Sequence, residues 1–367
     1  MKSCFAAVSN LLAAAFAILF ILAASLIIVV FIADLQLFNA ASYRRAMLDQ
    51  HVYERMPALA AEQIIYQADH PTSSASLAPE LKRLSQPDWE YLISQVLTTE
   101  AMRVQTENVI DQFFTYLAPP YTLIYASVDT SPKPLDLKIS LVDFKQNLDS
   151  QTGYNAILHI INQQPACTAQ EWEQLVNSVQ TAQFENIPFC HPPADVLTIA
   201  EPYLRTALHD LTATIPNEVH LEGRNISASG SARLDEFRLT YRRVRRWIGL
   251  SLCLPLILLA LTAVFGVRSL TGCGLWLGLP LAVTGLFTFV AALVTWRLPG
   301  WASSTASGGH LTAEGVAPGL TQALVDVATY IVHAAARTMG VVGILMVLLG
   351  GGLLVAGLLF GTARRHW

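Results

Sequence analysis

The sequence predicts a mainly α-helical membrane protein: a bundle of four transmembrane helices, one span followed by three, carries a mainly helical domain with a small β element. Four apolar runs contain no Asp, Glu, Lys, Arg or His, namely residues 5–33, 247–267, 275–296 and 339–360. Each is long enough to cross a hydrocarbon layer of about 30 Å as a helix. Residues 34–240 instead carry 25 acidic and 13 basic side chains, a net charge of −12, which excludes that segment from the membrane.

The first apolar run predicts an uncleaved signal anchor in residues 1–38. It follows Met1 and Lys2 and has 29 residues, whereas the core of a cleaved signal peptide has about 7–15. A helix of this length extends ~43 Å at ~1.5 Å per residue, so it must tilt or project beyond the bilayer.

Charges next to the spans predict that both termini are cytoplasmic and that residues 39–240 form an extracytoplasmic domain. We expect the protein to lie in the cytoplasmic membrane of the cell. Lys2 precedes the first span, Asp34 follows it, and Arg364 and Arg365 follow the last. Cytoplasmic segments carry an excess of Lys and Arg, and the first helix usually sets the orientation.

A basic cluster precedes the second span. A simple count of its positive charges would place this end of the span in the cytoplasm, opposite to the orientation above. Long translocated segments largely escape that bias, so we keep the domain outside. The arginines have two interpretations: they reach outer headgroups as snorkelling anchors, which we favour, or they face the acidic surface of the domain. The cluster consists of Arg238, Arg242, Arg243, Arg245 and Arg246.

A cysteine pair also favours export of the domain. Cys167 and Cys190 are the only cysteines of residues 34–240, and each lies close to proline. Two cysteines in an exported domain predict a disulfide, which would stabilise the fold by about 3 kcal/mol. The alternative is two buried thiols.

Within the domain, most segments predict helices. Apolar residues recur with helical spacing over 41–67, where Pro57 should kink or break the helix. Ser85 with Asp88, and Thr168 with Glu171, place an acid three residues after a hydroxyl, which indicates a capped helix start. Further predictions are helices over 100–116, 154–163, 171–180 and 194–214, strands over 121–127, 135–139 and 217–221, and a linker or hairpin tip over 226–232.

We expect residues 241–367 to form the last three spans, with a Ser/Gly-rich loop over 300–309. An extracytoplasmic amphipathic helix is predicted over about 318–338, where it leads into the last span. This helix either packs on the domain as a stalk or lies along the membrane surface. We favour the stalk, because one Asp and one Arg make a poor anchor for anionic lipid. Its apolar stripe consists of Leu320, Leu324, Val327, Ile331 and Ala335.

Glycines in the spans predict close helix packing. Gly274 with Gly278, and Gly357 with Gly361, have the Gly-x-x-x-Gly spacing that lets backbones approach in membranes. We favour packing among the protein's own helices over dimerisation. Pro255 and Pro280 could kink the second and third spans.

The sequence contains no recognisable catalytic, cofactor-binding or metal-binding signature. It lacks His-Glu-x-x-His, a Walker loop and Gly-x-Ser-x-Gly. The spans lack the ionisable residues that mark ion paths. We expect no cofactor, no nucleic-acid partner and no enzymatic activity. The alternative is an unfamiliar site near Cys190 and His191, to which Asp195, His209 and Asp210 could contribute.

The whole arrangement resembles a group of uncharacterised bacterial four-span membrane proteins with a large extracytoplasmic helical domain between spans 1 and 2. The resemblance is carried by the two capped Trp helices, the Pro-Ala-Cys…Cys-His-Pro-Pro pair and the Arg-Arg-Val-Arg-Arg-Trp segment. It implies no known activity. The layout is also similar to that of the permease subunits of MacB- and FtsX-type ABC systems, although the inner loop 268–274 is very short for docking an ATPase.

We therefore expect a non-enzymatic interaction or scaffold protein, whose partners are the lipid bilayer and an extracytoplasmic protein or other envelope ligand. A permease-like or mechanotransmission subunit is the first alternative, and an enzyme with an unrecognised site is the second.

Overall fold

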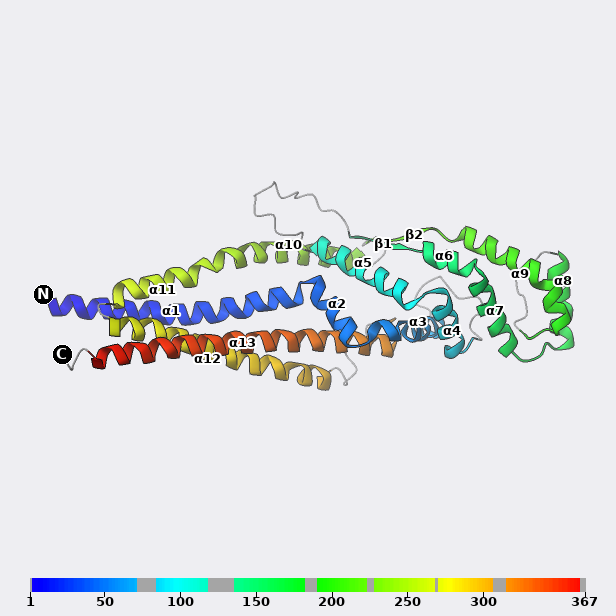
Figure 1. The fold of residues 1–367 in the computed structure, drawn as a ribbon. Coiled ribbons are helices and arrows are strands. Elements are labelled where there is room, and N and C mark those ends of the chain that lie inside the picture. The colour runs from blue at the N-terminus through cyan, green and yellow to red at the C-terminus, as the bar shows by residue number, and fades with distance from the viewer. Residues whose placement is uncertain are drawn as a thin grey trace.

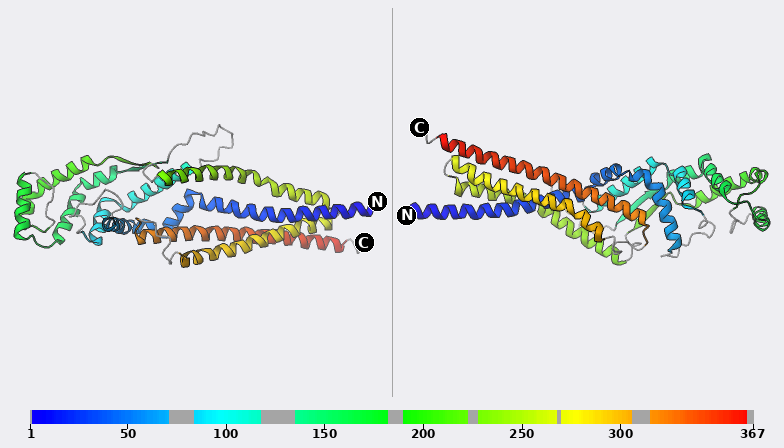
Figure 2. Two further views of the ribbon diagram at one scale, coloured as in Figure 1. Left: turned by 180° about the vertical axis from the view of Figure 1, so that it is seen from behind. Right: turned by 90° about the horizontal axis from the view of Figure 1, so that it is seen from below.

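The computed structural model describes residues 2–70, 84–117, 135–181, 190–222, 228–267, 270–305 and 315–363. Its elements are α1 (Lys2–Leu37), α2 (Ala40–Asp49), α3 (Val52–Asp69), α4 (Gln86–Val96), α5 (Thr99–Leu117), β1 (Asp136–Ser140), α6 (Val142–Leu148), α7 (Gln151–Gln163), α8 (Ala169–Thr181), α9 (Ala194–Thr214), β2 (Glu218–Glu222), α10 (Ala228–Ser251), α11 (Cys253–Gly266), α12 (Leu270–Thr305) and α13 (Pro318–Ala363). The molecule is elongated (Figure 1). In one half, α1, α11, α12 and α13 run along one another with both termini at the same end; α7, α8 and α9 lie at the opposite end (Figure 2).

Three helices are long and apolar enough to cross a membrane, through the segments Val8–Leu37, Gly272–Arg297 and Pro318–Leu359. They support the prediction of a membrane protein. The predicted second span is not one helix, because α10 ends at Ser251 and the apolar helix that follows has only 14 residues. Pro255 explains the division, since proline lacks the N–H that a continuous helix would direct at the Ser251 carbonyl.

Along much of its length, α1 turns small side chains inward and large ones outward, although Phe20 and Ile32 are large apolar side chains that it buries. Leu11, Leu22 and Leu26 are 71%, 61% and 65% exposed. This is the arrangement expected in lipid, where helices associate through close contact of small residues rather than by burial of large apolar ones. The buried face of α1 is formed by Ser9, Ala13, Ala17, Phe20 and Ala24.

The helices α12 and α13 pack against each other through glycines. Three of the four predicted packing glycines lie at this contact, and the fourth, Gly361, belongs to α13. Gly285 of α12 and Gly343 and Gly350 of α13 also lie at the contact, although none of them belongs to a Gly-x-x-x-Gly pair. In α13, Gly343, Gly350 and Gly357 recur every seven residues, which keeps them on one face of the helix. The facing pairs are Gly274 with Gly357, Gly278 with Gly350, and Gly285 with Gly343.

The predicted amphipathic helix and the last span form one uninterrupted helix, α13. Its 46 residues extend ~69 Å at ~1.5 Å per residue. The N-terminal part of α13 packs on α2 and α3 as a stalk. The stripe differs from the prediction: Leu324 is 55% exposed and Ala323 is buried in its place. The core of this contact contains Ala323, Val327 and Ile331 of α13 with Ala46, Val52 and Leu59.

Side chains of α3 cap the start of α13. The Gly319 N–H donates to Glu62 Oε1 at 2.9 Å, and the Ala317 N–H donates to Gln63 Oε1 at 2.8 Å. Gln63 Nε2 also donates to the Gly315 carbonyl at 2.9 Å. These bonds satisfy N–H groups that have no partner within the helix, and the Glu62 carboxylate lies at the positive end of the helix dipole. The stalk is therefore fixed to the domain at its first turn.

The break in the 41–67 segment lies at His51 and not at Pro57. His51 adopts the left-handed backbone conformation, with φ 52°, between α2 and α3. Pro57 is buried inside the continuous helix α3. The predicted break at proline is therefore wrong: α3 continues through Pro57, although proline cannot donate a backbone hydrogen bond there.

The outer part of the domain has its own core and the two predicted capped helices. Ser85 and Asp88 form a reciprocal capping box at the start of α4. Thr168 and Glu171 do the same at α8, where the Thr168 N–H donates to Glu171 Oε2 and the Glu171 N–H donates to Thr168 Oγ1. The core cluster consists of Val96, Leu148, Tyr154 and Leu208.

The strands β1 and β2 pair antiparallel, with Lys138 opposite His220, within one residue of the positions predicted at 135–139 and 217–221. Two loop predictions are wrong. The segment 226–232 enters α10 at Ala228, and α12 continues through 300–305. The predicted strand 121–127 lies outside the described residues.

Candidate functional site

A polar cleft of about 620 Å³ opens between α5, the two-stranded sheet and α10. The wall on α5 is a stripe of amide and hydroxyl side chains with spacings of three, four and three residues, which places them on one helix face. The stripe consists of Gln105, Asn108, Gln112 and Thr115.

Two residues of this stripe hold the outer edge of β1. Gln112 accepts a hydrogen bond from the Lys138 N–H at 2.8 Å and donates one to the Lys138 carbonyl at 3.0 Å. Gln105 accepts from the Ser140 N–H at 3.4 Å. The glutamine amides thus replace a third strand along an edge that would otherwise expose its backbone groups.

The floor of the cleft is the polar face of the sheet. Side chains alternate across a strand, so Asp136, Lys138 and Ser140 share this face and lie beside Glu218 of β2. His220 lies between the two acids: its Nδ1 is 3.0 Å from Asp136 Oδ1 and its Nε2 is 3.8 Å from Glu218 Oε2.

Two of the predicted basic cluster, Arg238 and Arg242, form the wall on α10. The Arg238 guanidinium lies 4.4 Å from the centre of the Tyr116 ring. Arg242 donates to the carbonyls of Tyr116 at 3.0 Å and Leu117 at 3.2 Å, and thereby caps the end of α5. Burial, followed by the nearby Arg238, lowers the pKa of Arg242.

A third arginine of the cluster contacts a buried acid of α1. Arg245 Nε is 3.6 Å from Asp34 Oδ2, and the Tyr241 hydroxyl donates to Asp34 Oδ1 at 2.7 Å. Asp34 is only 5% exposed. Arg238, Arg242 and Arg245 therefore contact the protein itself, whereas the interpretation as snorkelling anchors expects contacts with lipid headgroups. Arg243 is exposed.

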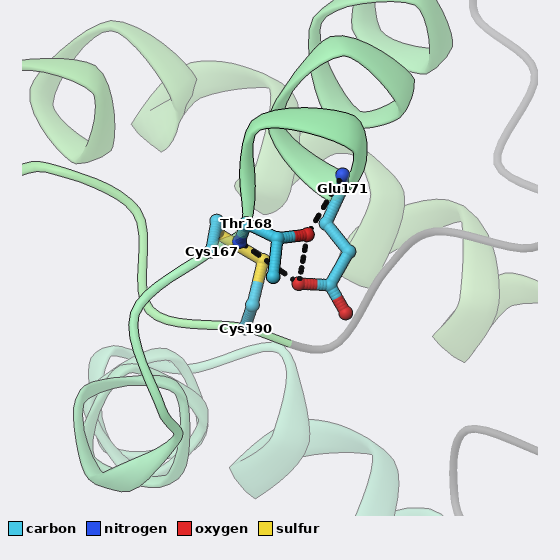
Figure 3. Close-up of a disulfide and its surroundings, with 4 residues drawn as sticks. All are labelled: Cys167, Thr168, Glu171 and Cys190. Atoms are coloured by element: carbon cyan, nitrogen blue, oxygen red, sulfur yellow. Dashed lines mark hydrogen bonds between the residues drawn. A yellow bond between two sulfur atoms is a disulfide. The ribbon is translucent and has the colours of Figure 1, made fainter.

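The predicted cysteine pair is bonded: the Sγ atoms of Cys167 and Cys190 are 2.02 Å apart (Figure 3). The bond ties the start of α8, next to the Thr168–Glu171 cap, to the segment that leads into α9. The Cys167 N–H donates to the His191 carbonyl, and the His191 N–H donates to the Pro165 carbonyl, so backbone bonds reinforce the same junction.

This arrangement gives no support to an enzyme site at Cys190 and His191. Cys190 is held in the disulfide, and His209 contacts Asp149 Oδ2 at 3.1 Å. Among the described residues, no three His, Cys, Asp or Glu side chains come together as metal ligands.

Sequence reasoning missed the cleft. Its traces in the sequence are the polar stripe on α5, the alternation of Asp136, Lys138 and Ser140, and the basic cluster that contains Arg238 and Arg242. Each of these is equally typical of a solvated surface.

Comparison with known proteins identifies no relative, because no family model, no curated protein and no solved structure matches the chain.

Proposed function

We propose that the protein is a non-enzymatic component of the cell envelope, in which a four-span bundle presents residues 39–240 on the extracytoplasmic side as a binding domain. The observation that carries this proposal is the stalk. One helix, α13, reaches from the membrane bundle into the core contact with α2 and α3, where Ile331 is 1% exposed. A domain held in this way keeps a fixed position relative to the membrane.

Contacts between α1 and the α10–α11 pair support a fourth crossing. The Ser9 hydroxyl donates to the Phe265 carbonyl at 2.7 Å, and Asp34 accepts from Tyr241 at 2.7 Å. Residues 9–34 and 241–265 therefore run antiparallel over the same length. Leu252 keeps helical dihedrals, φ −60° and ψ −26°, between the two shorter helices. With this crossing, both termini lie on the cytoplasmic side.

Thiol labelling tests the orientation and the disulfide together. In a variant whose only cysteines are Cys167 and Cys190, a membrane-impermeant maleimide should leave intact cells unlabelled before reduction and label them after a membrane-impermeant reductant. The reason is that disulfides persist in oxidising compartments outside the cytoplasm. A variant that retains only Cys273, at the other end of the bundle, should stay unlabelled in intact cells. Labelling of the pair only after the cells are opened places the domain inside and removes the proposal.

A mechanotransmission subunit is the second candidate, and the unbroken α13 is the observation that favours it, since a single helix transmits movement along its axis. This candidate requires a cytoplasmic ATPase in contact with residues 268–274 or 364–365. Photo-crosslinkers placed in those two segments should capture an ATPase if the candidate is correct. Crosslinking to lipid alone would remove it.

A further inference from the structure

The described residues that line the cleft between α5, the sheet and α10 carry charges of both signs, and none of them has an aliphatic side chain. Its lining carries three cationic residues, Lys138, Arg238 and Arg242, and three acids, Asp111, Asp136 and Glu218. Asp111 also pairs with Arg44 of α2 at 3.5 Å, which leaves Asp136 and Glu218 as the acids that face the cations across the cleft. Its volume of about 620 Å³ falls within the range of about 300–1,000 Å³ typical of small-molecule sites. Protein interfaces, in contrast, usually centre on buried aromatic or apolar anchors.

The cationic wall is in place before any ligand arrives. Arg238 is held over the Tyr116 ring and is only 7% exposed, and Arg242 is held by two carbonyls of α5. Like charges four residues apart on a helix repel each other, and the lowered pKa of Arg242 reflects this together with burial. An anionic group that contacts both guanidinium groups would relieve the repulsion, and the fixed side chains would lose little further entropy on binding.

The sheet carries the acidic side. Asp136 and Glu218 are exposed on its polar face, where His220 already lies against one oxygen of each carboxylate. A purely anionic ligand would meet these carboxylates, and a purely cationic ligand would meet the guanidinium groups. A neutral sugar would cover charged groups without supplying opposite charges, which costs free energy. A ligand with an anionic group at one end and an ammonium group at the other avoids all three problems.

We propose that this cleft binds a small zwitterion, with its anionic group against Arg238 and Arg242 and its ammonium group against Asp136 and Glu218. The proposal rests on the function proposed above and names the chemistry that the extracytoplasmic domain recognises. The ligand is a free solute or the headgroup of a lipid, because α10 leads directly from the cleft to the membrane bundle.

Calorimetric titration of the full-length protein in detergent tests this charge pattern. The probes are phosphoethanolamine, methyl phosphate, ethanolamine and the neutral trisaccharide maltotriose. Phosphoethanolamine should bind about ten-fold or more tightly than methyl phosphate or ethanolamine, because each half of the molecule makes its own charge-assisted contacts. Equal binding of methyl phosphate, a preference for maltotriose, or no binding of any probe would overturn the proposal.

Glu218→Gln provides the matched test, since it removes one exposed charge and keeps the shape of the side chain. It should weaken the binding of phosphoethanolamine about ten-fold, and methyl phosphate should bind as tightly as before or more tightly. Glu173→Gln, an exposed acid on α8 away from the cleft, should change neither. Equal effects of the two substitutions would refute the assignment of the acidic side.

Lipid nanodiscs distinguish the two sources of the zwitterion. If the natural ligand is a lipid headgroup, phosphatidylethanolamine nanodiscs should compete with soluble phosphoethanolamine and phosphatidylglycerol nanodiscs should not. If it is a solute, neither should compete. The thiol-labelling result is independent of these titrations, so failure of the ligand assignment is distinguishable from failure of the proposed orientation.

Discussion

Gly350→Ala is expected to lower the free energy of unfolding by about 1–3 kcal/mol, although it adds only a methyl group and introduces a better helix former. A Cβ at this position would lie 2.6 Å from the Gly278 carbonyl oxygen and would collide with the Ala282 backbone nitrogen. Backbone atoms cannot rotate away as the end of a side chain can, so α12 and α13 must separate along the contact. Reversible denaturation of the full-length protein in micelles, followed by tryptophan fluorescence, measures the change.

The matched control is Gly351→Ala, one residue further along the same helix and at the same depth. A Cβ there meets no atom of the described residues within 4 Å. This substitution should leave the stability unchanged or raise it by up to about 1 kcal/mol, the difference in helix propensity between Gly and Ala. If both substitutions destabilise the protein equally, the glycines act through the backbone of α13 alone and the described contact with α12 is wrong.

Features that depend on local chemistry could be predicted from the sequence. Apolar runs, the hydroxyl–acid caps at Ser85 and Thr168, and the alternation within β1 are each determined by neighbours a few residues away. The cysteine pair was predictable for a different reason: residues 34–240 contain only Cys167 and Cys190, so only one intramolecular pairing exists there.

Features that depend on distant contacts could not be predicted. The arginines of α10 precede a predicted span, and their position in the sequence alone suggests that they anchor the helix at the membrane surface. Their partners, Asp34 on α1 and Tyr116 with Leu117 on α5, are between about 120 and 210 positions away in the chain. The cleft is hidden for the same reason, because its floor and its two walls come from three separate segments.

The predicted second span shows why composition alone does not determine whether a segment forms one continuous helix. Residues 247–267 have the apolar length of a crossing, yet whether one helix fills that length depends on a single imino acid, Pro255. The contacts of α1 at Ser9 and Asp34 then decide that the two shorter helices together follow the whole length of the bundle.

Ile331→Ala is expected to loosen the attachment of the domain to its stalk. Ile331 is 1% exposed and packs with Val52 and Leu59 in the contact between α13 and α2–α3. Truncation of a buried isoleucine costs about 2–5 kcal/mol, because apolar contacts are lost and a cavity remains. Amide hydrogen exchange in α2 and α3 should accelerate by about 30-fold or more, since each 1.4 kcal/mol of lost local stability changes the open population tenfold. Exchange in the apolar half of α13 should stay unchanged.

Leu324→Ala, two turns earlier on the same helix, separates packing from helix propensity. It removes a comparable side chain, but Leu324 is 55% exposed, so the change in stability should stay within about 0.5 kcal/mol. If this substitution accelerates exchange in α2 and α3 as much as Ile331→Ala does, the core contact does not hold the stalk. The domain would then move freely on the membrane bundle, and the observation that supports a fixed binding domain would be lost. If only Ile331→Ala has the effect, the stalk is rigid because of this contact and not because α13 is long.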